Sequence, residues 1–509
     1  MNIVFRVDAS LKIGAGHVMR CLTLANALKQ QGAEVEFICR EHEGNLIERI
    51  EQQDFQVYKL PQNTEIITEI DGSEREKLYG TQWLGSTQQQ DAEHCKPILE
   101  KIQPDWLIVD HYAIDQTWQA LLKENYKKIM VIDDLANRQY HCDILLDQTY
   151  GRKEEDYLGL VPKNCQMLLG PRYAILRPEF AEWRDYSLKR RANPELKKLL
   201  ITMGGVDPDN MTGQVLEVLK SCDLPEGLEI TVVMGETAPN IDVVEKKAKK
   251  IPYATQVKTN VNNMAELMAN ADLAIGAAGA TTWERCCLGL PSILVVAAEN
   301  QIKVFEELDS INAIESIWNI KDLLTEIEGI MLKSNKLSLI SSSLTDGEGV
   351  YKAAENIYSS NSEKKSLLLK PVSEIDRDFI YGLQTKQIRK YFRNRTVPSL
   401  NDHINWYKKM LKSHSSQVFI LMMEENKVGM LRVDNILNQV VEVSIIISSS
   451  FSGQGLAKKA LSLIEKILLF KTLKAVIHRE NIASKKVFKS FGFELEKQNG
   501  IFEEYLKNV

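Results

Sequence analysis

The sequence predicts an α/β protein built from two lobes with parallel sheets, followed by a smaller α+β domain. Short apolar runs alternate with amphipathic helical segments over roughly the first two-thirds of the chain, as strands and crossover helices of a parallel sheet do. A strand, a glycine-rich loop and a helix follow one another twice, near residues 3–30 and again near residues 271–296. Beyond about residue 360 the pattern changes to an antiparallel hairpin followed by a single glycine loop and helix.

Length and composition limit the classes of function. The chain has 509 residues, enough for about three globular domains. Its net charge of -6 at pH 7 and its pI near 5.9 do not indicate the positively charged surface that binds nucleic acid. We therefore expect no nucleic-acid partner. No apolar run reaches the ~20 residues of a membrane span, and the first residues do not resemble a signal peptide. We therefore expect a cytoplasmic protein without a membrane span, whose oligomeric state composition does not determine.

The cysteines and histidines form no metal-binding pattern. All 8 cysteines lie between Cys21 and Cys287, none belongs to a CxxC pair, and several fall inside apolar segments where cysteine packs as a small hydrophobe. The 8 histidines show no HExxH spacing. We therefore predict reduced, structural cysteines and no metal site built by the protein.

The stretch RVDASLKIGAGHVMRC, residues 6–21, predicts an anion site with a base beside it. Gly14 and Gly16 leave room for a ligand next to the backbone, and free amides at the following helix start favour a negative group such as a diphosphate. His17 falls in the first helical turn, where a neutral imidazole can accept a proton from water. The spacing is not GxGxxG, so no nicotinamide cofactor is implied. We predict a phosphorylated substrate, His17 as the base, and substrate contacts from Gly14, Gly16 and Arg20.

Further apolar runs in the first lobe predict strands at residues 33–40, 105–110, 127–134 and 142–148. Polar side chains follow these runs, and ligands of open α/β sheets bind beyond the carboxyl ends of the strands. These side chains are Asp110, His111, Tyr112, Asp133 and Asp134. Each could equally be a helix cap or a turn residue. Together they predict a sugar-binding rim that includes Asp110 as a substrate contact.

Two further segments complete the predicted first lobe. The polar stretch at residues 64–90 has no sustained apolar face until its end, which predicts a loop and an exposed helix over the cleft. Tyr79 and Trp83 are candidate substrate contacts there. The proline-bounded stretch at residues 168–180 predicts the point where the chain leaves the first lobe.

A second lobe is predicted to begin at residues 197–210, where an apolar strand, paired glycines and a helix start signal repeat the pattern. Its strongest signal is the small-residue loop at residues 276–280, because little side-chain bulk lets a diphosphate approach backbone amides. Tight packing of a helix through small residues is the structural alternative. The candidate substrate contacts of this lobe are Gly204, Gly205, Ala278, Gly279, Thr281, Thr282, Glu284, Asn300 and Gln301.

The strings RVDAS, IGAGH and MRCLTLA, in this order within residues 6–25, resemble the N-terminal signature of the nucleotide-sugar hydrolases of pseudaminic acid biosynthesis. These enzymes remove UDP from a diacetamido-trideoxy-altropyranose. The resemblance implies two Rossmann-like lobes of the glycosyltransferase-B-like type, as in the enzyme that makes lipid II. It also implies that His17 is the general base and that Glu284 accepts hydrogen bonds from ribose hydroxyls.

The last third of the chain predicts a different fold. Residues 419–434 predict a hairpin that turns at Glu425, and SGQGLA at residues 452–457 offers backbone amides to a diphosphate. Together with NIASKKVFKSFGFE at residues 481–494, these strings resemble the GCN5-related N-acetyltransferases (GNAT), which implies acetyl-CoA as co-substrate. The implied contacts with acetyl-CoA are Ile447, Gly453, Gly455, Ala457 and Asn481.

Two departures from that family concern the chemistry. Ser452 stands where an arginine or glutamine usually opens the loop, and Phe488 stands where many members carry the tyrosine that protonates the leaving thiolate. No cysteine lies beyond Cys287, so acetyl would pass directly from the thioester to an amine. Glu442, on the strand before the loop, is the candidate base, directly or through water. An ordinary edge-strand carboxylate and catalysis by His478 are the alternatives.

The predicted organisation has four parts: an N-terminal lobe with the catalytic histidine at residues 1–180, a nucleotide-binding lobe at residues 181–350, a polar linker at residues 351–365 and an acetyltransferase domain at residues 366–509. We expect a bifunctional enzyme that hydrolyses a UDP-linked diacetamido sugar and N-acetylates its 4-amino precursor. The rivals are a UDP-sugar glycosyltransferase, a related hydrolase for a different sugar epimer, and a nucleotide-sugar sensor that catalyses nothing.

Overall fold

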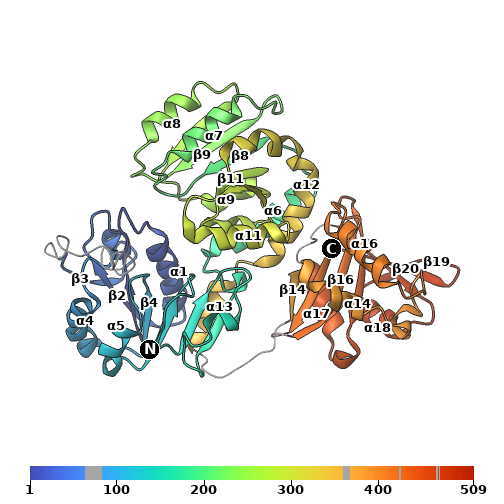
Figure 1. The fold of residues 1–509 in the computed structure, drawn as a ribbon, viewed down its shortest axis with the longest axis horizontal. Helices are drawn as coiled ribbons and strands as arrows, with labels where there is room; N and C mark the ends of the chain where they lie inside the picture. Colours follow the sequence, from blue (N-terminus) through green and yellow to red (C-terminus); the bar gives the residue numbers. More distant parts are fainter. Residues whose placement is uncertain (63–82, 359–366, 424–425, 466–467, 469–470) are drawn as a thin grey trace.

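The computed structural model describes residues 1–62, 83–358, 367–423, 426–465, 468 and 471–509. Over these residues the chain forms three sheets, each belonging to one of the three bodies seen in Figure 1. The first two sheets are parallel throughout, whereas the third is antiparallel except for one pair of strands. The predicted class, two parallel α/β lobes followed by an α+β domain, is therefore confirmed.

The first lobe is built on a seven-stranded sheet in the order β3-β2-β1-β4-β5-β6-β7. Its strands are β1 (Asn2–Val7), β2 (Glu34–Arg40), β3 (Gln56–Leu60), β4 (Trp106–Asp110), β5 (Lys128–Ile132), β6 (Ile144–Asp147) and β7 (Gln166–Leu169). Its helices include α1 (Gly16–Gln30), α2 (Ile47–Glu51), α4 (Gln88–Ile102) and α5 (Gln116–Leu121). The near-continuous apolar runs of β1 and β4 are buried, as parallel strands between helical layers require.

The strand order changes direction at β1, which pairs with β2 on one side and with β4 on the other. In open α/β sheets, ligands bind at this switch point, beyond the carboxyl ends of the strands. His17 lies in the first turn of α1, directly after β1, and Asp110 is the last residue of β4. The topology therefore brings both residues to the same edge of the sheet.

The second lobe repeats this plan with a six-stranded sheet in the order β10-β9-β8-β11-β12-β13. Its strands are β8 (Lys198–Thr202), β9 (Glu229–Met234), β10 (Ala254–Thr259), β11 (Leu273–Ala277), β12 (Ser292–Val295) and β13 (Glu315–Ile317). Its helices are α7 (Met211–Leu219), α8 (Ile241–Ala248), α9 (Met264–Asn270), α10 (Thr281–Cys287), α11 (Ile302–Ser310) and α12 (Leu323–Leu344). The loops after β8 and β11 meet at the switch point of this sheet, because β8 and β11 are neighbours.

The chain passes between the two lobes twice. Helix α6 (Pro178–Arg190) packs on the second lobe, and α13 (Gly349–Tyr358) returns to the first, where Val350 and Ile357 join the core around α1. Figure 1 shows α13 beside the first sheet. Residues 351–358, predicted as part of a linker, are therefore a packed helix, because the first lobe covers their apolar face.

The third domain has a seven-stranded sheet in the order β14-β15-β16-β17-β18-β20-β19. Its strands are β14 (Leu367–Pro371), β15 (Ser416–Met423), β16 (Asn426–Asp434), β17 (Val440–Ile447), β18 (Thr472–His478), β19 (Glu494–Asn499) and β20 (Phe502–Asn508). Its helices are α14 (Arg377–Gly382), α15 (Lys386–Arg389), α16 (Leu400–Leu411), α17 (Leu456–Glu465) and α18 (Ile482–Ser490). Strands β15 and β16 form the predicted hairpin, but Glu425, expected in its turn, lies outside the described residues.

Strands β17 and β18 run parallel and then part. Their pairing begins at Val440 with Thr472 and ends at Glu442 with Lys474. Strand β17 nevertheless continues to Ile447, and β18 continues to His478. Beyond Glu442 the facing edges carry backbone groups that are not bonded to each other, so the sheet opens a gap in its middle.

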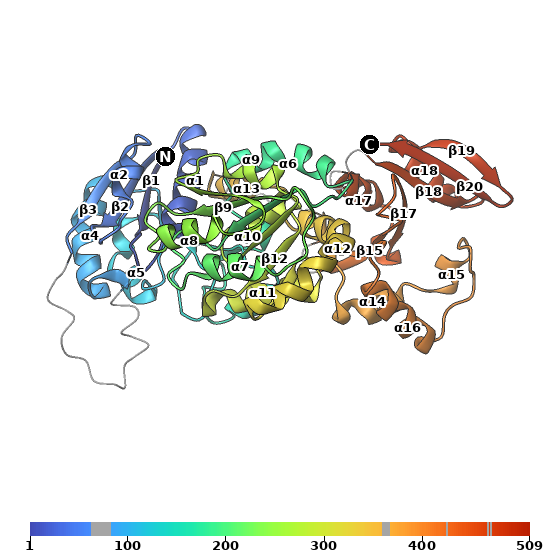
Figure 2. The same ribbon diagram turned by 90° about the horizontal axis from the view of Figure 1, so that it is seen from above.

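The third domain packs directly against the second lobe. Leu339 of α12 joins the hydrophobic core of the third domain, and Lys336 Nζ donates to Leu411 O at 2.6 Å. Burial lowers the pKa of Lys336 to about 8. Figures 1 and 2 both show α12 between the second sheet and the strands of the third domain. The third domain is therefore held by packing as well as by its chain connection.

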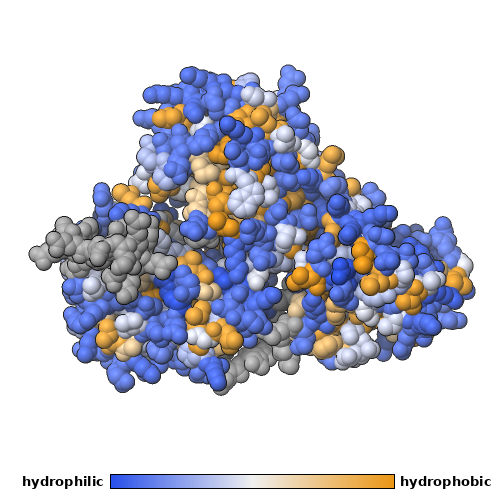
Figure 3. Space-filling view, viewed as in Figure 1, coloured by the Kyte–Doolittle hydropathy of each residue, from blue (hydrophilic) through white to orange (hydrophobic). Residues whose placement is uncertain are grey.

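Figure 3 shows hydrophilic residues over most of one face, with hydrophobic residues in separate patches. None of the helices in the described part of the chain combines the length and apolar character that crossing a bilayer requires. Among the residues that the structure places, no group of three or more His, Cys, Asp or Glu side chains is arranged to hold a metal ion.

The crossing of the two interlobe segments generates a stability prediction. A Cβ at Gly349 would lie 2.3 Å from Ala174 O, which is too close without a backbone shift. We expect Gly349→Ala to lower the free energy of unfolding by about 1–3 kcal/mol, measured by denaturant titration. Gly329→Ala, in α12, is the matched control, since a Cβ there meets nothing within 4 Å and alanine favours the helix. Equal stability of the two variants would contradict the close crossing.

Candidate active sites

The loop after β1 has the open shape that its glycines predict. Gly14 has a φ of +80°, which L side chains rarely adopt, and its N–H donates to Ser10 O at 2.8 Å. A Cβ at Gly14 or Gly16 would meet no other atom within 4 Å. Helix α1, 15 residues long, has no side-chain cap at Ala15. Its first amides are therefore available to an anion.

A buried carboxylate holds His17. The Nδ1 of His17 lies 2.6 Å from Asp110 Oδ1. Arg20, one turn along α1, donates to both oxygens of Asp110 from Nε and Nη2, each at 2.6 Å. All three side chains are at most 9% exposed. One carboxylate thus fixes the candidate base and its neighbouring cation.

This arrangement determines the tautomer of His17. Because an ionised carboxylate only accepts hydrogen bonds, Nδ1 must carry the hydrogen. Arg20 Nη2 lies 3.2 Å from the same Nδ1, but two donors do not bond to each other. The neutral imidazole then has its lone pair on Nε2, the atom that a general base needs. The Tyr112 ring, edge-on with its centroid 4.6 Å away, restricts the imidazole plane.

Asp110 is ionised throughout the neutral pH range. Burial alone would raise its pKa, but the charges of Arg20 and His17 and their hydrogen bonds hold that pKa well below its ordinary value. The sequence predicts Asp110 and Arg20 as substrate contacts. Asp110 is 1% exposed and both of its oxygens already accept hydrogen bonds, so it holds the candidate base and offers no free oxygen to a sugar. Arg20 Nη1 lies 3.5 Å from the partly exposed Asp134, so Arg20 stays a candidate contact.

The rest of the predicted rim divides into two groups. Tyr112 donates to Asp134 Oδ2 at 2.9 Å, and the ring centroids of Trp83 and Tyr112 lie 5.3 Å apart. The side chain of Asp134 is 25% exposed. By contrast, the buried Asp133 accepts a hydrogen bond from Tyr157 at 2.8 Å inside the lobe. Tyr112 therefore lies against His17, and Trp83 and Asp134 lie against Tyr112, whereas Asp133 belongs to the core.

In the second lobe, the small-residue loop after β11 is packed tightly from behind. A Cβ at Gly276 would lie 2.6 Å from both Arg285 Nη1 and Thr202 O. The buried Arg285 donates to Ala277 O at 2.6 Å and to Thr282 Oγ1 at 3.2 Å. Thr282 is 1% exposed. Tight packing of the helix against the loop therefore explains the small residue at Gly276. It also explains Thr282, because the Thr282 hydroxyl faces the interior of the lobe.

The front of the same loop is more open. A Cβ at Gly279 would meet only Gln301 Nε2, at 3.5 Å. Gln301 is fixed because its Oε1 accepts from Ala297 N at 2.9 Å. Thr281, the first residue of α10, is half-buried, whereas Ala278 is 2% exposed. The structure thus brings Gly279 and Gln301 together.

Two predicted substrate contacts fall outside the part of the chain that the structure describes. Tyr79 falls outside the described residues, and so does the side chain of Asn300. No position is therefore assigned to either side chain.

Glu284, half-buried one turn into α10, titrates near neutrality. Burial raises its pKa to about 7, against the opposing charges of Arg177 and Arg285. A carboxyl group in this state can accept a hydrogen bond from a sugar hydroxyl when ionised and donate one when protonated. Such a perturbed pKa beside a loop is typical of functional groups.

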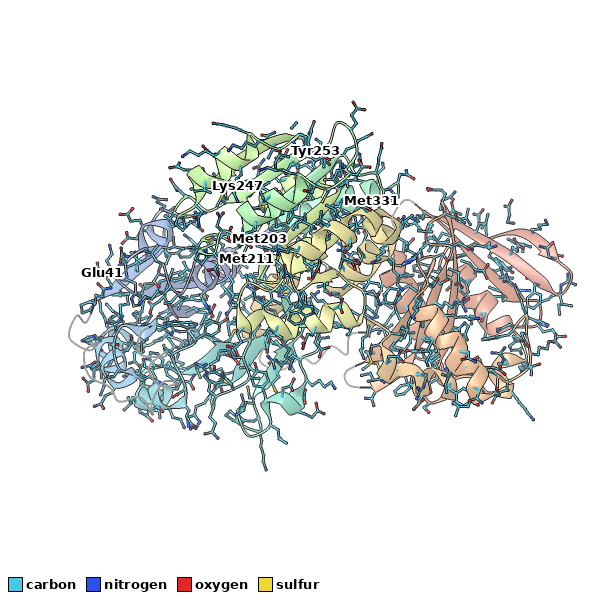
Figure 4. The ribbon with its side chains drawn as sticks, turned by 45° about the horizontal axis from the view of Figure 1, so that its top comes forward. Glu41, Met203, Met211, Lys247, Tyr253 and Met331 are labelled. Atoms are coloured by element: carbon cyan, nitrogen blue, oxygen red, sulfur yellow. The ribbon has the colours of Figure 1, made fainter. Side chains whose placement is uncertain are left out.

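The loop after β8 differs from the loop after β11 because its helix is already capped. Gly204 has a φ of +100°, and a Cβ at Gly205 would meet nothing within 4 Å. Asp207 accepts from the first amide of α7, that of Met211, at 2.8 Å. Met203 and Met211, which flank this loop, are labelled in Figure 4. The amide at the start of α7 is therefore occupied, whereas Gly204 and Gly205 are exposed and have open space where a side chain would stand.

In the third domain, the glycine loop follows Ile447 at the parting of β17 and β18. Gly453 and Gly455 have φ of +81° and +72°, and a Cβ at either would meet nothing within 4 Å. The first turn of α17 begins on the loop, since Lys459 N donates to Gly455 O at 3.2 Å. The amide of Ala457 lies within that turn. An open loop beside a gap in the sheet suits an extended cofactor that carries a diphosphate.

The two candidate bases of the third domain already face cations. Glu442, where the strands part, lies 3.3 Å from Lys474 Nζ and 3.2 Å from Arg393 Nη2. His478 is 5% exposed, and its Nε2 lies 3.0 Å from Arg395 Nη2. Both arginines come from the segment between α15 and α16. This segment therefore contacts both strands that border the gap.

Two other predicted positions have structural roles. Phe488 is 6% exposed and meets Phe493 edge to face, with ring centroids 5.0 Å apart. Asn481 is the N-cap of α18, and its Oδ1 accepts from Ser484 N at 3.1 Å. The Ser452 hydroxyl lies 3.5 Å from a backbone carbonyl, that of residue 448. Phe488 therefore contributes to packing, and Asn481 already caps α18.

A group of buried charged residues that the sequence motifs do not predict lies beneath the first-lobe site. Arg6 and Asp8 lie within RVDAS, and Arg40 and Asp91 face them; all four are at most 1% exposed. Arg6 donates to Asp91 Oδ2 at 2.6 Å and to Asp8 Oδ1 at 2.7 Å. Arg40 Nη2 donates to Asp91 Oδ2 at 2.6 Å. One feature of the sequence could have predicted this group: each of two apolar strands contains an arginine. An arginine is buried inside a protein only when an acidic partner pairs with it.

Family models match the second lobe and the third domain. The glycosyltransferase family 28 C-terminal domain matches residues 199–357, and the acetyltransferase (GNAT) domain matches residues 366–494. The fold is similar to the crystal structure of Acinetobacter baumannii MurG, with a TM-score of 0.51 and 14% identity over 70% of this chain and 99% of that chain. The two-lobed, glycosyltransferase-B-like fold and the C-terminal GNAT domain are thereby confirmed.

Several relatives extend over both lobes. The chain is 30% identical over 303 residues to the UDP-2,4-diacetamido-2,4,6-trideoxy-β-L-altropyranose hydrolase of Campylobacter jejuni, covering 59% of this chain and 93% of that protein. It is 28% identical over 521 residues to an uncharacterised protein of Methanocaldococcus jannaschii, covering 98% of each. The chain belongs to the UDP-2,4-diacetamido-2,4,6-trideoxy-β-L-altropyranose hydrolase family and fuses that hydrolase homologue to a C-terminal GNAT acetyltransferase domain.

Proposed function

We propose that the chain performs two neighbouring steps of pseudaminic acid biosynthesis. The third domain transfers acetyl from acetyl-CoA to the 4-amine of a UDP-linked amino sugar. The two lobes then hydrolyse the resulting UDP-2,4-diacetamido-2,4,6-trideoxy-β-L-altropyranose to UDP and the free sugar. The observation that carries this proposal is His17, whose Nδ1 is bound to Asp110 and whose Nε2 is free to accept a proton beside the open start of α1. The relative from Campylobacter jejuni supports the choice of sugar.

In the hydrolase, water is the nucleophile. His17 Nε2 takes a proton from water as its oxygen bonds to the anomeric carbon. The bond from that carbon to the UDP oxygen breaks, its electron pair leaves with UDP, and the configuration inverts. Backbone amides near Gly279 and the amide of Gln301 are proposed to bind the departing diphosphate, and Glu284 the ribose hydroxyls. Asp134 is proposed to face the sugar.

In the acetyltransferase, the sugar amine attacks the thioester carbonyl of acetyl-CoA. Glu442 accepts the amine proton, directly or through water, the carbon–sulfur bond breaks and coenzyme A leaves as a thiolate. The amides of Gly453, Gly455 and Ala457 are proposed to bind the diphosphate of the cofactor. Because Phe488 has no hydroxyl, we assign protonation of the thiolate to water. The acetyl group is never attached to the protein, since no cysteine lies in this domain.

Replacement of His17 tests the hydrolase. We expect His17→Asn to slow UDP release by about 100-fold to 10,000-fold, because the variant lacks the base. Its affinity for UDP stays within a few-fold of wild type, because the loop amides are unchanged. UDP release is followed with a coupled assay without any sugar acceptor, and UDP affinity is measured by calorimetry. His141→Asn, at an exposed histidine, is the control and keeps full activity. Near-normal turnover of His17→Asn excludes this base, and a requirement for an added hydroxyl acceptor favours a glycosyltransferase.

Titration of Glu284 tests the nucleotide site. Its pKa of about 7 means that the carboxylate, the better acceptor for ribose hydroxyls, disappears as the pH falls through neutrality. We expect the Kd of uridine to rise by up to about ten-fold per pH unit below 7, measured by calorimetry. Uridine is the probe because it has no phosphate that titrates in this range. Glu284→Gln does not titrate in this range, so its Kd for uridine should not change with pH. If the Kd of this variant depends on pH as in the wild type, Glu284 does not bind the ribose.

The order of the two reactions gives a third test. A free 4-amine is mostly cationic at neutral pH, so in a pocket for an amide it loses a hydrogen bond and brings in an unpaired charge, each costing ~1 to 3 kcal/mol or more. We expect the hydrolase to discriminate at least ~10-fold against the unacetylated sugar. Supplying the UDP-linked 4-amino sugar should therefore give little UDP until acetyl-CoA is added.

Gly455→Glu supplies the variant for this test, because it puts a bulky negative charge where the backbone φ is +72°. It should abolish the stimulation by acetyl-CoA. Gly500→Glu, at another positive-φ glycine in the exposed β19–β20 turn, is the matched control and keeps the stimulation. Rapid UDP release from the amine without acetyl-CoA would reverse the order of the two steps.

A further inference from the structure

The charged residues beneath the first-lobe site form a closed group. Arg6, Asp8, Arg40 and Asp91 are at most 1% exposed and contribute two positive and two negative charges. Arg6 Nη1 donates to Asp8 Oδ1 at 2.7 Å, and the backbone N–H of Arg40 donates to the same oxygen, also at 2.7 Å. This group ties β1, β2 and α4 together. One oxygen of Asp8 is therefore fully committed to neighbouring strands.

The second oxygen of Asp8 faces the turn that follows β4. Asp8 Oδ2 lies 3.3 Å from His111 Nε2 and 3.6 Å from His42 Nε2, both within ion-pair distance. Asp8 Oδ2, His111 Nε2 and His42 Nε2 are buried and make no hydrogen bond in the described structure, so their closest polar contacts are with one another. His111 directly follows Asp110, the carboxylate that holds His17. Asp8 thus contacts the turn that begins at the base-orienting residue.

The tautomer of His111 follows from its other nitrogen. His111 Nδ1 accepts the backbone N–H of Ala113 at 3.0 Å, so in a neutral ring the hydrogen must be on Nε2, the nitrogen that lies 3.3 Å from Asp8 Oδ2. Burial lowers the pKa of His111, although Asp8 opposes this, so the ring is neutral. His111 therefore closes its own turn with one nitrogen and contacts the buried carboxylate with the other.

We propose that Asp8 is a positioning residue for the hydrolase: through His111 it fixes the turn at residues 110–113, and thereby holds Asp110 and Tyr112 around His17. The expected loss of kcat rests on the proposed hydrolysis. The contacts of Asp8 exist without any substrate and do not depend on it. His17 is the base, Asp110 orients the base, and Asp8 orients the segment that carries Asp110.

An amide at Asp8 cannot replace the carboxylate. Oδ1 accepts from two donors, Arg6 and the N–H of Arg40, so in Asp8→Asn the amide oxygen must take that place. The amide NH₂ group then faces His111 Nε2 and requires it to become an acceptor. The hydrogen of His111 moves to Nδ1, and the bond from Ala113 N is lost. An isosteric substitution therefore opens the turn next to Asp110.

The experiment combines kinetics with nitrogen NMR of the full chain. We expect Asp8→Asn to lower kcat for UDP release by about 10-fold to 100-fold with KM within about three-fold, because the base is misplaced while the nucleotide site is intact. In the resting protein, the nitrogen shifts should show His111 protonated at Nε2 in the wild type and at Nδ1 in the variant. The Nδ1 shift of His17 should also change, reporting its weakened bond to Asp110. His42→Gln removes the other imidazole that faces the same oxygen, and it should leave kcat and the His17 shift unchanged.

If Asp8→Asn does not fold, His111→Asn replaces it. This variant keeps an oxygen for Ala113 N–H but is too short to reach Asp8, and it should show the same loss of kcat. A folded Asp8→Asn or His111→Asn with kcat within about three-fold of wild type and an unchanged His17 shift overturns the proposal. So does a wild-type His111 protonated at Nδ1. If the wild type hydrolyses no UDP-linked sugar, the proposed function fails, while the nitrogen shifts still decide whether Asp8 positions His17.

Discussion

The carboxylate of Asp110 is the interaction on which the first-lobe site depends. It receives hydrogen bonds from His17 Nδ1 and from two nitrogens of Arg20, and burial makes each contact stronger than it would be in water. Removing one partner of such a buried pair typically costs about 3–5 kcal/mol, since the other charge stays behind unpaired. The same carboxylate links the end of β4 to the first turn of α1. The candidate base is thereby held by two elements of the first lobe, a strand of its sheet and its first helix.

The two lobes share one solution to substrate placement. The strand order of each parallel sheet reverses once, and each sheet places a glycine-containing loop and a helix start at that point. The first lobe offers His17 as the candidate base, whereas the second offers Gly279, Gln301 and a carboxyl group, Glu284, that titrates near neutrality. The third domain adds a split sheet and is packed on α12 through Leu339 and Lys336. Two reactions on one nucleotide-linked sugar are consistent with this arrangement.

Periodicity and glycine placement were enough to predict the architecture, because strands, crossover helices and positive-φ glycines are determined by local sequence. His17 was identified in the same way, as the histidine beside an open helix start. The role of Asp110 was not, because both of its partners lie on α1, far away in the sequence, and only the sheet order brings them together. Residues 351–358 were predicted as part of a polar linker because the sequence does not show that their few apolar side chains pack on the first lobe. Thr282 was predicted as a substrate contact, but its hydroxyl packs against Arg285. The sequence of a small-residue loop does not indicate which of its side chains face the interior.

Carbon–oxygen cleavage by an activated water is the central claim, and oxygen-isotope transfer tests it most directly. The wild-type chain is given UDP-2,4-diacetamido-2,4,6-trideoxy-β-L-altropyranose in water enriched in oxygen-18, and both products are analysed by mass spectrometry soon after release. Attack at the anomeric carbon, with His17 as the base, predicts the heavy oxygen in the sugar and none in UDP. Heavy oxygen in the phosphate of UDP would mean that water attacks phosphorus, and this would contradict the account.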